Sequence, residues 1–237
     1  MTPHLPPLTE PSARLKTTLA QMRHFNSLPP EVQNTIAAAA VPRYFDAGQV
    51  IYIEGETAEY IYILERGWVK ATRMSRDGRE QAMLFLRPVE IFGDIAVFTG
   101  TTYPGTVTAL EAVDAWQVPS ATLMALVKQH PELALAVIRK LGERVLHYIE
   151  LVEDLSLRSV EARLANTLLQ HAEEVDGYLI VPRHAWTTFD EMAVRLGTVR
   201  DVLGRALKTL EAEGLLKVGK KEIVLLDAKG LAERGSL

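Results

Sequence analysis

The sequence predicts an α+β fold in which an antiparallel β domain precedes a long helix and a C-terminal helix-turn-helix. Three observations lead to this prediction. Short β-favouring runs separated by turn signals fill residues 48–118, helical periodicity continues from Pro131 to about Leu157, and two amphipathic segments meet at Gly197.

The amino-acid composition excludes several classes of protein and several kinds of metal-binding and catalytic site. The 237 residues suffice for two domains. The absence of cysteine excludes disulfides, thiolate zinc sites, cysteine-ligated iron–sulfur clusters and a cysteine nucleophile. No run approaches about 18 uninterrupted apolar residues, so we expect a soluble cytoplasmic protein with no membrane partner. The net charge of -4 argues mildly against nucleic-acid binding, although residues 199–221 hold six Lys/Arg against three Asp/Glu.

The N-terminal part of the chain is expected to be helical after a tail. Residues 1 to about 13 are rich in proline and predict a mobile tail. A short helix is predicted over residues 15–22. A second helix is predicted to begin at Pro30, because proline suits a first helical turn, and to end before Pro42.

From Val41 the pattern changes to short runs of apolar, β-branched and aromatic residues. Turn signals such as Gly55-Glu56 and Asp77-Gly78 separate them, which is typical of an antiparallel sandwich or barrel. Residues 92–105 are rich in glycine and threonine and predict a loop with a short helix lining the interior. The predicted strands are 48–53, 60–64, 67–72, 81–86, 106–110 and 114–118.

Two helices are predicted to begin at Pro119 and Pro131. Apolar residues of the second alternate at steps of three and four, which favours a parallel pairing with a second copy. The alternative is a single helix packed on its own β domain. The residues of this seam are Ile138, Leu141, Val145, Tyr148, Val152 and Leu155. The segments predicted to follow are a hinge at Ser156 and Ser159, a helix over 160–172 and a strand over 178–182.

Gly197 separates the two helices of the predicted helix-turn-helix. Thr188 is placed to cap the first helix and Thr198 the second, each with an acidic residue three positions later. In the second helix one face is apolar, formed by Val202, Leu203, Ala206, Leu207 and Leu210. The opposite face is polar and consists of Arg200, Asp201, Gly204, Arg205 and Lys208.

The polar face suits the major groove of double-stranded DNA. Arginine matches guanine O6 and N7, and aspartate accepts from cytosine N4, so we predict base contacts at Arg200, Asp201 and Arg205. A basic turn between predicted strands over 215–218 and 223–226 suggests a wing. The alternative is an ordinary helical hairpin with a solvated charged face. Contacts to the DNA backbone, which carry no sequence information, are predicted at Thr188, Thr198, Lys208, Lys220 and Lys221.

The chain resembles the Crp/Fnr superfamily of bacterial transcription regulators over about residues 24–227. The resemblance rests on Gly48, Gly55-Glu56, the run from Tyr62 to Gly67, Phe92-Gly93-Asp94, the long helix and LGTVRDVLGRALKTLEAEGLL over residues 196–216. It implies a sensor β-roll (a double-stranded β-helix or jelly roll), a dimerisation helix and a winged helix-turn-helix. It further implies a homodimer on an inverted repeat of DNA and RNA polymerase as a partner. The predicted domains are a tail and short helix (1–23), a cyclic-nucleotide-binding-like β-roll (24–130), a dimerisation helix with hinge (131–158) and the DNA-binding domain (159–237).

The recognition helix matches the cAMP-responsive branch of that superfamily closely. Arg200, Asp201 and Arg205 occupy positions where that branch has Arg, Glu and Arg in contact with bases. Asp201 is shorter than Glu by one methylene, so the base preference at the middle position can differ.

The effector site departs from that branch. Where the branch has an Arg-Ser pair for the cyclic phosphate, this chain has Tyr103-Pro104, and neither residue supplies a fixed positive fork. The Thr-Ser pair that contacts adenine there corresponds to Tyr148-Ile149. We therefore predict that cAMP is not the effector. The candidate pocket residues are Asp94, Thr99, Thr101, Thr102, Tyr103 and Tyr148.

Besides an unidentified small ligand, or no ligand at all, the sequence leaves other interpretations of the sensor domain open. A haem-based sensor of NO or CO is one, with His24 and His147 as candidate ligands. A ligand-binding sensor that acts on a protein partner is another. An enzyme is not predicted, because the sequence has no nucleophile elbow, no GxxxxGK phosphate loop and no metal-ligand spacing.

Overall fold

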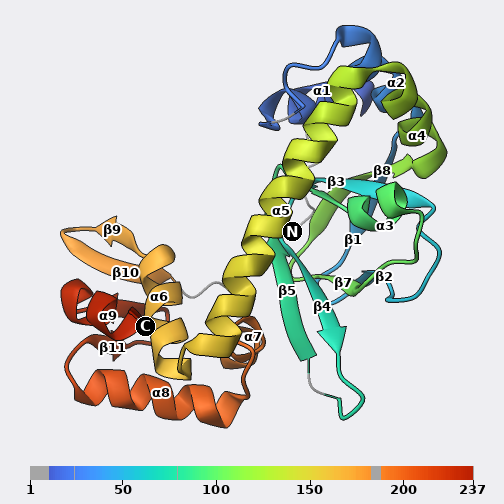
Figure 1. The fold of residues 1–237 in the computed structure, drawn as a ribbon. Helices are drawn as coiled ribbons and strands as arrows, with labels where there is room; N and C mark the ends of the chain where they lie inside the picture. The colour runs from blue at the N-terminus through green and yellow to red at the C-terminus, as the bar shows by residue number, and fades with distance from the viewer. Residues whose placement is uncertain (1–10, 24, 79, 183–187, 237) are drawn as a thin grey trace. The chain divides into compact units, whose positions relative to one another are not determined.

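The computed structural model of the protein describes residues 11–23, 25–78, 80–182 and 188–236 (Figure 1). Its contacts divide the chain into two compact units. The first comprises residues 1–73 and 84–145, and the second comprises residues 74–83 and 146–237.

Antiparallel strands form two four-stranded sheets, most of whose residues belong to the first unit. Their orders are β1-β8-β3-β6 and β2-β7-β4-β5. The strands are β1 (Val41–Phe45), β2 (Val50–Tyr52), β3 (Tyr60–Arg66), β4 (Val69–Met74), β5 (Glu80–Leu86), β6 (Ile91–Phe92), β7 (Thr106–Ala109) and β8 (Val113–Pro119). The antiparallel prediction is confirmed, and β1 and β6 are strands that the turn signals did not predict.

The β3–β8 pair is central to the first of these sheets. Ile61 pairs with Val118 and Ile63 with Trp116, and all four side chains are buried. Gly67 closes the turn after β3 with φ of 83°, and a Cβ there would overlap the carbonyl oxygen of Ala112. Only glycine fits this turn without displacing the backbone.

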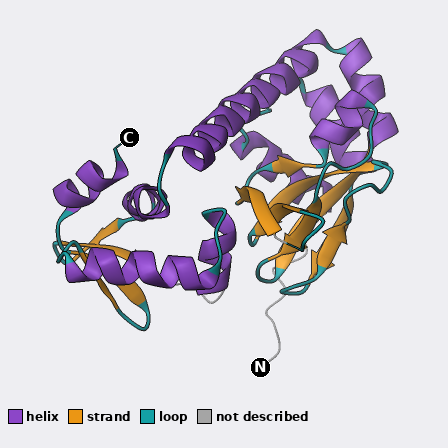
Figure 2. Ribbon diagram, turned by 60° about the horizontal axis from the view of Figure 1, so that its bottom comes forward, coloured by secondary structure: helices purple, strands orange, loops and turns teal. Residues whose placement is uncertain are grey.

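Helices of the first unit gather at one end of the strands (Figure 2). Proline stands at the first position of α2, as predicted, whereas α1 begins at Pro11, so residues 11–13, which were expected to belong to the tail, are helical. The apolar sides of the helices form one core with Ile61, Ile63 and Trp116. The helices are α1 (Pro11–Gln21), α2 (Pro30–Ala39), α3 (Asp94–Thr99), α4 (Ser120–Gln129) and the first part of α5 (Pro131–Leu157).

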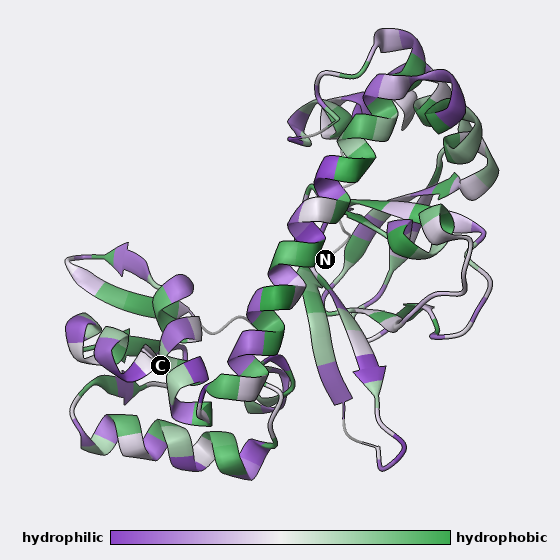
Figure 3. Ribbon diagram, viewed as in Figure 1, coloured by the Kyte–Doolittle hydropathy of each residue, from purple (hydrophilic) through white to green (hydrophobic). Residues whose placement is uncertain are grey.

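Apolar and polar residues alternate along the long helix α5 (Figure 3), and the apolar side chains differ in burial. Leu133 and Val137 are buried in the core of the first unit. The predicted seam is mostly open: Ile138 and Val152 are each 62% exposed and Val145 is 57% exposed. No helix in the described part of the chain is long and apolar enough to span a bilayer.

The second unit contains a small sheet and helices around their own apolar core. Ser159 caps α6, because its hydroxyl accepts the Ala162 amide at 3.1 Å. The sheet order is β11-β12-β10-β9, so the wing strands β11 and β12 extend a hairpin made by β9 and β10. The elements are α6 (Val160–Gln170), β9 (Glu173–Val175), β10 (Tyr178–Pro182), α7 (Phe189–Arg195), α8 (Arg200–Ala212), β11 (Leu216–Val218), β12 (Glu222–Leu225) and α9 (Ala228–Gly235).

Candidate nucleic-acid interface and effector pocket

The first helix of the pair, α7, is fixed at both ends. The Thr188 hydroxyl accepts a hydrogen bond from the backbone amide three residues later at 3.2 Å, which confirms the predicted cap. Gly197 adopts φ of 62°. The amides of Gly197 and Thr198 donate to the carbonyls of Val194 and Ala193 at 3.3 and 2.9 Å. This is a Schellman motif, which ends α7 abruptly and sets the turn.

The cap predicted for the second helix is wrong. Val199, rather than Thr198, is the N-cap residue of α8, and none of the side chains that the structure describes caps this helix. The physical reason is that the Thr198 amide completes the Schellman motif of α7, so one more residue is needed before α8 can start. Thr198 lies half-buried in the turn, and its contact with DNA backbone stays a prediction.

The two faces of α8 divide as the sequence predicts. Leu203, Ala206, Leu207 and Leu210 are buried in the core of the unit, whereas Val202, also predicted on this face, is only half-buried. A Cβ added at Gly204 would meet no atom of the described residues within 4 Å, so this glycine leaves open surface. The predicted contact residues on the helix are all exposed: Arg200, Asp201, Arg205 and Lys208.

Arg200 is tied to the neighbouring helix. Its Nη1 donates to Asp190 Oδ2 at 2.9 Å, and both side chains are 63% exposed. In contrast, the structure gives Arg205 and Lys208 no side-chain partner among the residues it describes. The sequence carries no signal for the Asp190 contact, because helical periodicity does not relate positions on opposite sides of a turn.

The wing is present as predicted. The Gly219 amide donates to the Glu222 carbonyl at 2.8 Å and closes the turn between β11 and β12. Lys220 and Lys221 are exposed at its tip. The tip therefore carries two positive charges suited to phosphate oxygens.

A side chain of α8 holds the wing. Glu211 accepts a hydrogen bond from the Val218 amide at 2.9 Å through its Oε1. The amide belongs to the last residue of β11, so the carboxylate joins the helix to the hairpin beside the wing tip.

Arg195 has a structural role in the second unit. Its Nη1 lies 2.7 Å from His171 Nε2, and His171 Nδ1 lies 2.9 Å from the Thr167 carbonyl. Guanidinium only donates, so the network assigns Nε2 as the acceptor and places the ring proton on Nδ1. Burial lowers the pKa of Arg195 to about 10, and the charge of Glu191 opposes that shift. This arginine joins α7 to the end of α6.

The interior of the β domain is filled by aromatic rings. Tyr52 stacks on Tyr103 with centroids 3.8 Å apart, and Tyr62 stacks on Phe92 at 5.1 Å. The Tyr103 hydroxyl donates to the Tyr60 carbonyl at 2.6 Å. Burial raises the pKa of Tyr103 to about 12, so this phenol stays protonated near neutral pH. The predicted pocket residue Tyr103 is thus part of a packed core.

Asp94 lies beside this core with a charged partner. It is 2% exposed, and its Oδ1 is 3.5 Å from Nη1 of Arg144. Nη2 of Arg144 donates to the Ile91 carbonyl at 3.0 Å. Burial raises the pKa of Asp94, and the Arg144 charge opposes the shift. The burial of Arg144, though not its contact with Asp94, could have been predicted from the sequence, because this residue follows Val137 by seven positions, or two helical turns.

The other predicted pocket residues are less buried than Asp94 and Tyr103. Thr99, Thr101 and Thr102 are exposed, and the hydroxyls of Thr99 and Thr101 lie 2.9 Å apart. Tyr148 is half-buried on α5 in the second unit, where its ring lies beside that of His147. An effector role for these residues stays a prediction.

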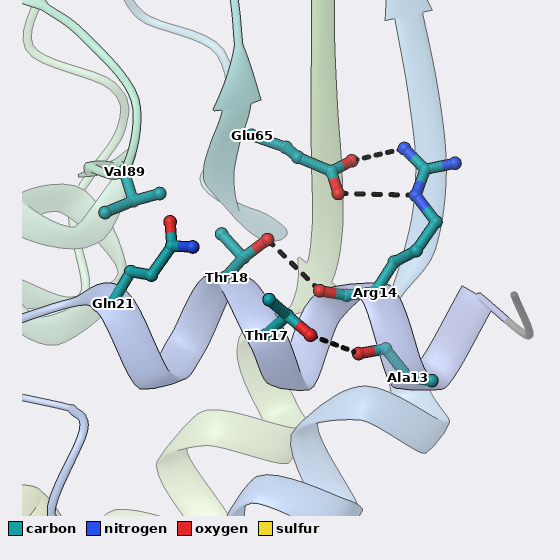
Figure 4. A pocket seen from close by; sticks show the side chains of 7 residues that line it. All are labelled: Ala13, Arg14, Thr17, Thr18, Gln21, Glu65 and Val89. Carbon is teal, nitrogen blue, oxygen red and sulfur yellow. Dashed lines mark hydrogen bonds and ion pairs between the residues drawn. The ribbon is translucent and has the colours of Figure 1, made fainter. Parts of the chain in front are cut away.

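A hollow of about 290 Å³ lies elsewhere, along α1 (Figure 4). Its charged groups already pair, because Arg14 contacts Glu65 at 2.6 Å. The Thr17 and Thr18 hydroxyls donate to carbonyls one helical turn earlier. None of the predicted effector residues lines this hollow. Its lining is Ala13, Arg14, Thr17, Thr18, Gln21, Glu65 and Val89.

The candidate haem ligands are placed as follows. His147 is exposed, and its Nε2 lies 3.2 Å from the Met83 carbonyl. His24 lies outside the described residues. Within the described ranges there is no group of three or more His, Asp or Glu side chains that could hold a metal ion.

Two protein families match the chain in this order. Residues 42–130 match the cyclic nucleotide-binding domain, and residues 162–234 match the Crp-like helix-turn-helix domain. The first match covers the β domain and the second covers α7, α8 and the wing.

Curated relatives match over most of their length. A CRP-like cAMP-activated global transcriptional regulator of Mycobacterium tuberculosis is 26% identical over 219 residues, which cover 91% of this chain and 97% of the relative. A global nitrogen regulator of Synechococcus elongatus is 26% identical over 200 residues, covering 81% and 88%. These relatives are regulators and not enzymes.

Solved structures share the fold. FixK2 of Bradyrhizobium japonicum gives a TM-score of 0.71 at 22% identity, covering 84% of this chain and 98% of that one. A CRP/FNR-family regulator of Thermus thermophilus gives a TM-score of 0.66 at 26% identity, covering 82% and 98%. With the predicted motifs, both family matches and full-length relatives in agreement, the chain belongs to the Crp/Fnr superfamily of DNA-binding transcription regulators.

Proposed function

We propose that the protein acts as a homodimer that reads an inverted repeat of DNA, with an effector other than cAMP or with no effector. The observation that carries the proposal is the division of α8. Its apolar face builds the core, while Arg200, Asp201, Arg205 and Lys208 remain exposed on the other face beside a lysine-tipped wing. We assign the first three to bases and Lys208, Lys220 and Lys221 to phosphates.

The open side of α5 supports a second copy as the partner. Ile138, Val145 and Val152 recur at seven-residue spacing and are each more than half exposed. Such a stripe in water is unfavourable unless a partner covers it. A parallel pair would relate two α8 helices by a two-fold axis, which is why we expect half-sites about one helical turn of DNA apart.

The packing around Tyr103 argues against cAMP. A cyclic phosphate needs a charged or hydrogen-bonding cradle, whereas Tyr103 stacks on Tyr52 and uses its hydroxyl on the Tyr60 carbonyl. Pro104 has no amide hydrogen to offer. The guanidinium that pairs with Asp94 is that of Arg144, which also donates to the Ile91 carbonyl. Calorimetric titration with cAMP should therefore show no binding in the micromolar range, and binding there would overturn this part of the proposal.

Selection from random DNA tests the proposed reading function. The wild-type protein should enrich a palindrome, and Arg205→Ala should weaken its binding by about 1–3 kcal/mol while relaxing the preference at one base of each half-site. Lys208→Ala should weaken binding to all sequences alike and reduce the salt dependence. Lys229 is exposed on α9, and Lys229→Ala is the matched control. This variant should change neither the base preference nor the salt dependence of binding.

The same selection separates the competing functions. A sensor that acts on a protein partner would enrich no sequence and would show no salt-dependent DNA affinity. RNA polymerase remains the protein partner that we expect, and transcription in vitro from a promoter that carries the selected palindrome would reveal it.

A further inference from the structure

Asp190 and Arg200 form a contact that the proposed reading function does not use. Asp190 is the second residue of α7 and Arg200 is the first residue of α8, so the ion pair joins the two helices of the helix-turn-helix. The 2.9 Å bond joins Asp190 Oδ2 to one terminal nitrogen, Nη1, of the guanidinium. Each side chain is 63% exposed.

Stability is a poor explanation for this pair. An ion pair between two well-exposed side chains gains little net free energy, because water screens it and two flexible chains must be ordered. The connection between α7 and α8 is already determined by the Schellman motif at Gly197 and by the apolar core. The hydrogen bond between Arg200 and Asp190 therefore acts locally, by holding the Arg200 side chain in one orientation.

The atoms used by the bond matter for base recognition. A guanidinium has five N–H donors in a planar fork. With Nη1 directed to Asp190, Nε and Nη2 remain as a parallel pair of donors. Such a pair matches guanine O6 and N7. A long side chain held in one orientation also loses less rotamer freedom when it binds.

We propose that Asp190 is a positioning residue for base recognition, which holds Arg200 so that its Nε–Nη2 edge faces a guanine. This rests on the proposed function, in which Arg200 contacts a base. Asp190 has a second effect of known sign. Its negative charge is carried two residues after a predicted backbone contact, Thr188, and would repel phosphate, so we expect it to lower affinity for DNA of any sequence. Asp190 thus increases discrimination at one base while it decreases non-specific binding.

The test uses the full-length protein and the palindrome selected by the wild type. The base read by Arg200 is the position whose preference disappears in Arg200→Ala. At that position Asp190→Ala should reduce discrimination roughly three- to tenfold, since orientation and not the contact itself is lost. Affinity for non-specific DNA should rise. Asp190→Asn, which keeps an acceptor oxygen, should restore part of the discrimination.

Two controls separate positioning from a change of net charge. Glu233→Ala removes one exposed acid on α9 and should leave discrimination unchanged. In the Arg200→Ala background, Asp190→Ala should still raise affinity for non-specific DNA, because that effect comes from the carboxylate charge and needs no guanidinium. Unchanged discrimination in Asp190→Ala at the base read by Arg200, or an equal fall at the base read by Arg205, would overturn the inference. Failure of the wild type to select any palindrome would instead overturn the proposed function, and the inference with it.

Discussion

Replacing Arg144 with methionine is expected to lower the free energy of unfolding by about 3 kcal/mol, because it leaves the buried Asp94 carboxyl without its charged partner. We expect a loss of free energy of unfolding at the low end of what removing one partner of a buried ion pair costs. The reason is that Asp94 keeps a hydrogen bond from the Ile95 amide. Chemical denaturation at one fixed protein concentration measures the change.

Two further variants identify the cause of that loss. Arg139→Met removes an exposed arginine from the same helix and should change stability by less than about 0.5 kcal/mol. Combining Asp94→Asn with Arg144→Met removes both charges and should recover a large part of the loss. If Arg144→Met alone were as stable as the wild type, the ion pair would have no structural role, and an effector role for Asp94 would gain support.

Placing a charge in the seam of α5 is expected to have the largest effect on DNA binding. Val152 is 62% exposed in the single chain, so Val152→Asp should leave the fold intact. A dimer would have to bury that carboxylate, and we expect monomers at micromolar concentrations in analytical ultracentrifugation. Loss of the second half-site contact should then weaken binding to the palindrome by at least about a hundredfold.

Glu150→Gln provides the comparison for the seam variant. Glu150 is exposed two residues before Val152, on the side of α5 away from the predicted seam. This variant should remain dimeric and bind the palindrome as the wild type does. A Val152→Asp protein that stays dimeric would show that another surface joins the copies.

Elements with strong local signals could be predicted from the sequence. Pro30, Gly197 and the apolar spacing of α8 each restrict the backbone or one helix face directly, so their helices lie where predicted. Elements without such signals were missed. The two-residue strand β6 and the three-residue strand β9 are too short for a pattern of their own, and only pairing with distant strands makes them part of a sheet.

The features of the candidate site also divide into those that a local sequence pattern predicts and those that it does not. Exposure of Arg205 and Lys208 could be predicted because it depends on position around one helix. The bonds of Asp190 with Arg200 and of Asp94 with Arg144 could not, since they join separate elements. The stacking of Tyr103 on Tyr52 likewise depends on two segments that are 51 positions apart.

The hydrogen bond from the Val218 amide to Glu211 has a mechanical consequence. It joins the wing hairpin to α8, so the recognition helix and the lysine-bearing tip are held at a fixed separation. A duplex whose groove and backbone spacing match that separation would bind without strain. Other duplexes would have to deform, at an energetic cost set by their own sequence. The regulator would thereby select the stiffness of DNA as well as its bases.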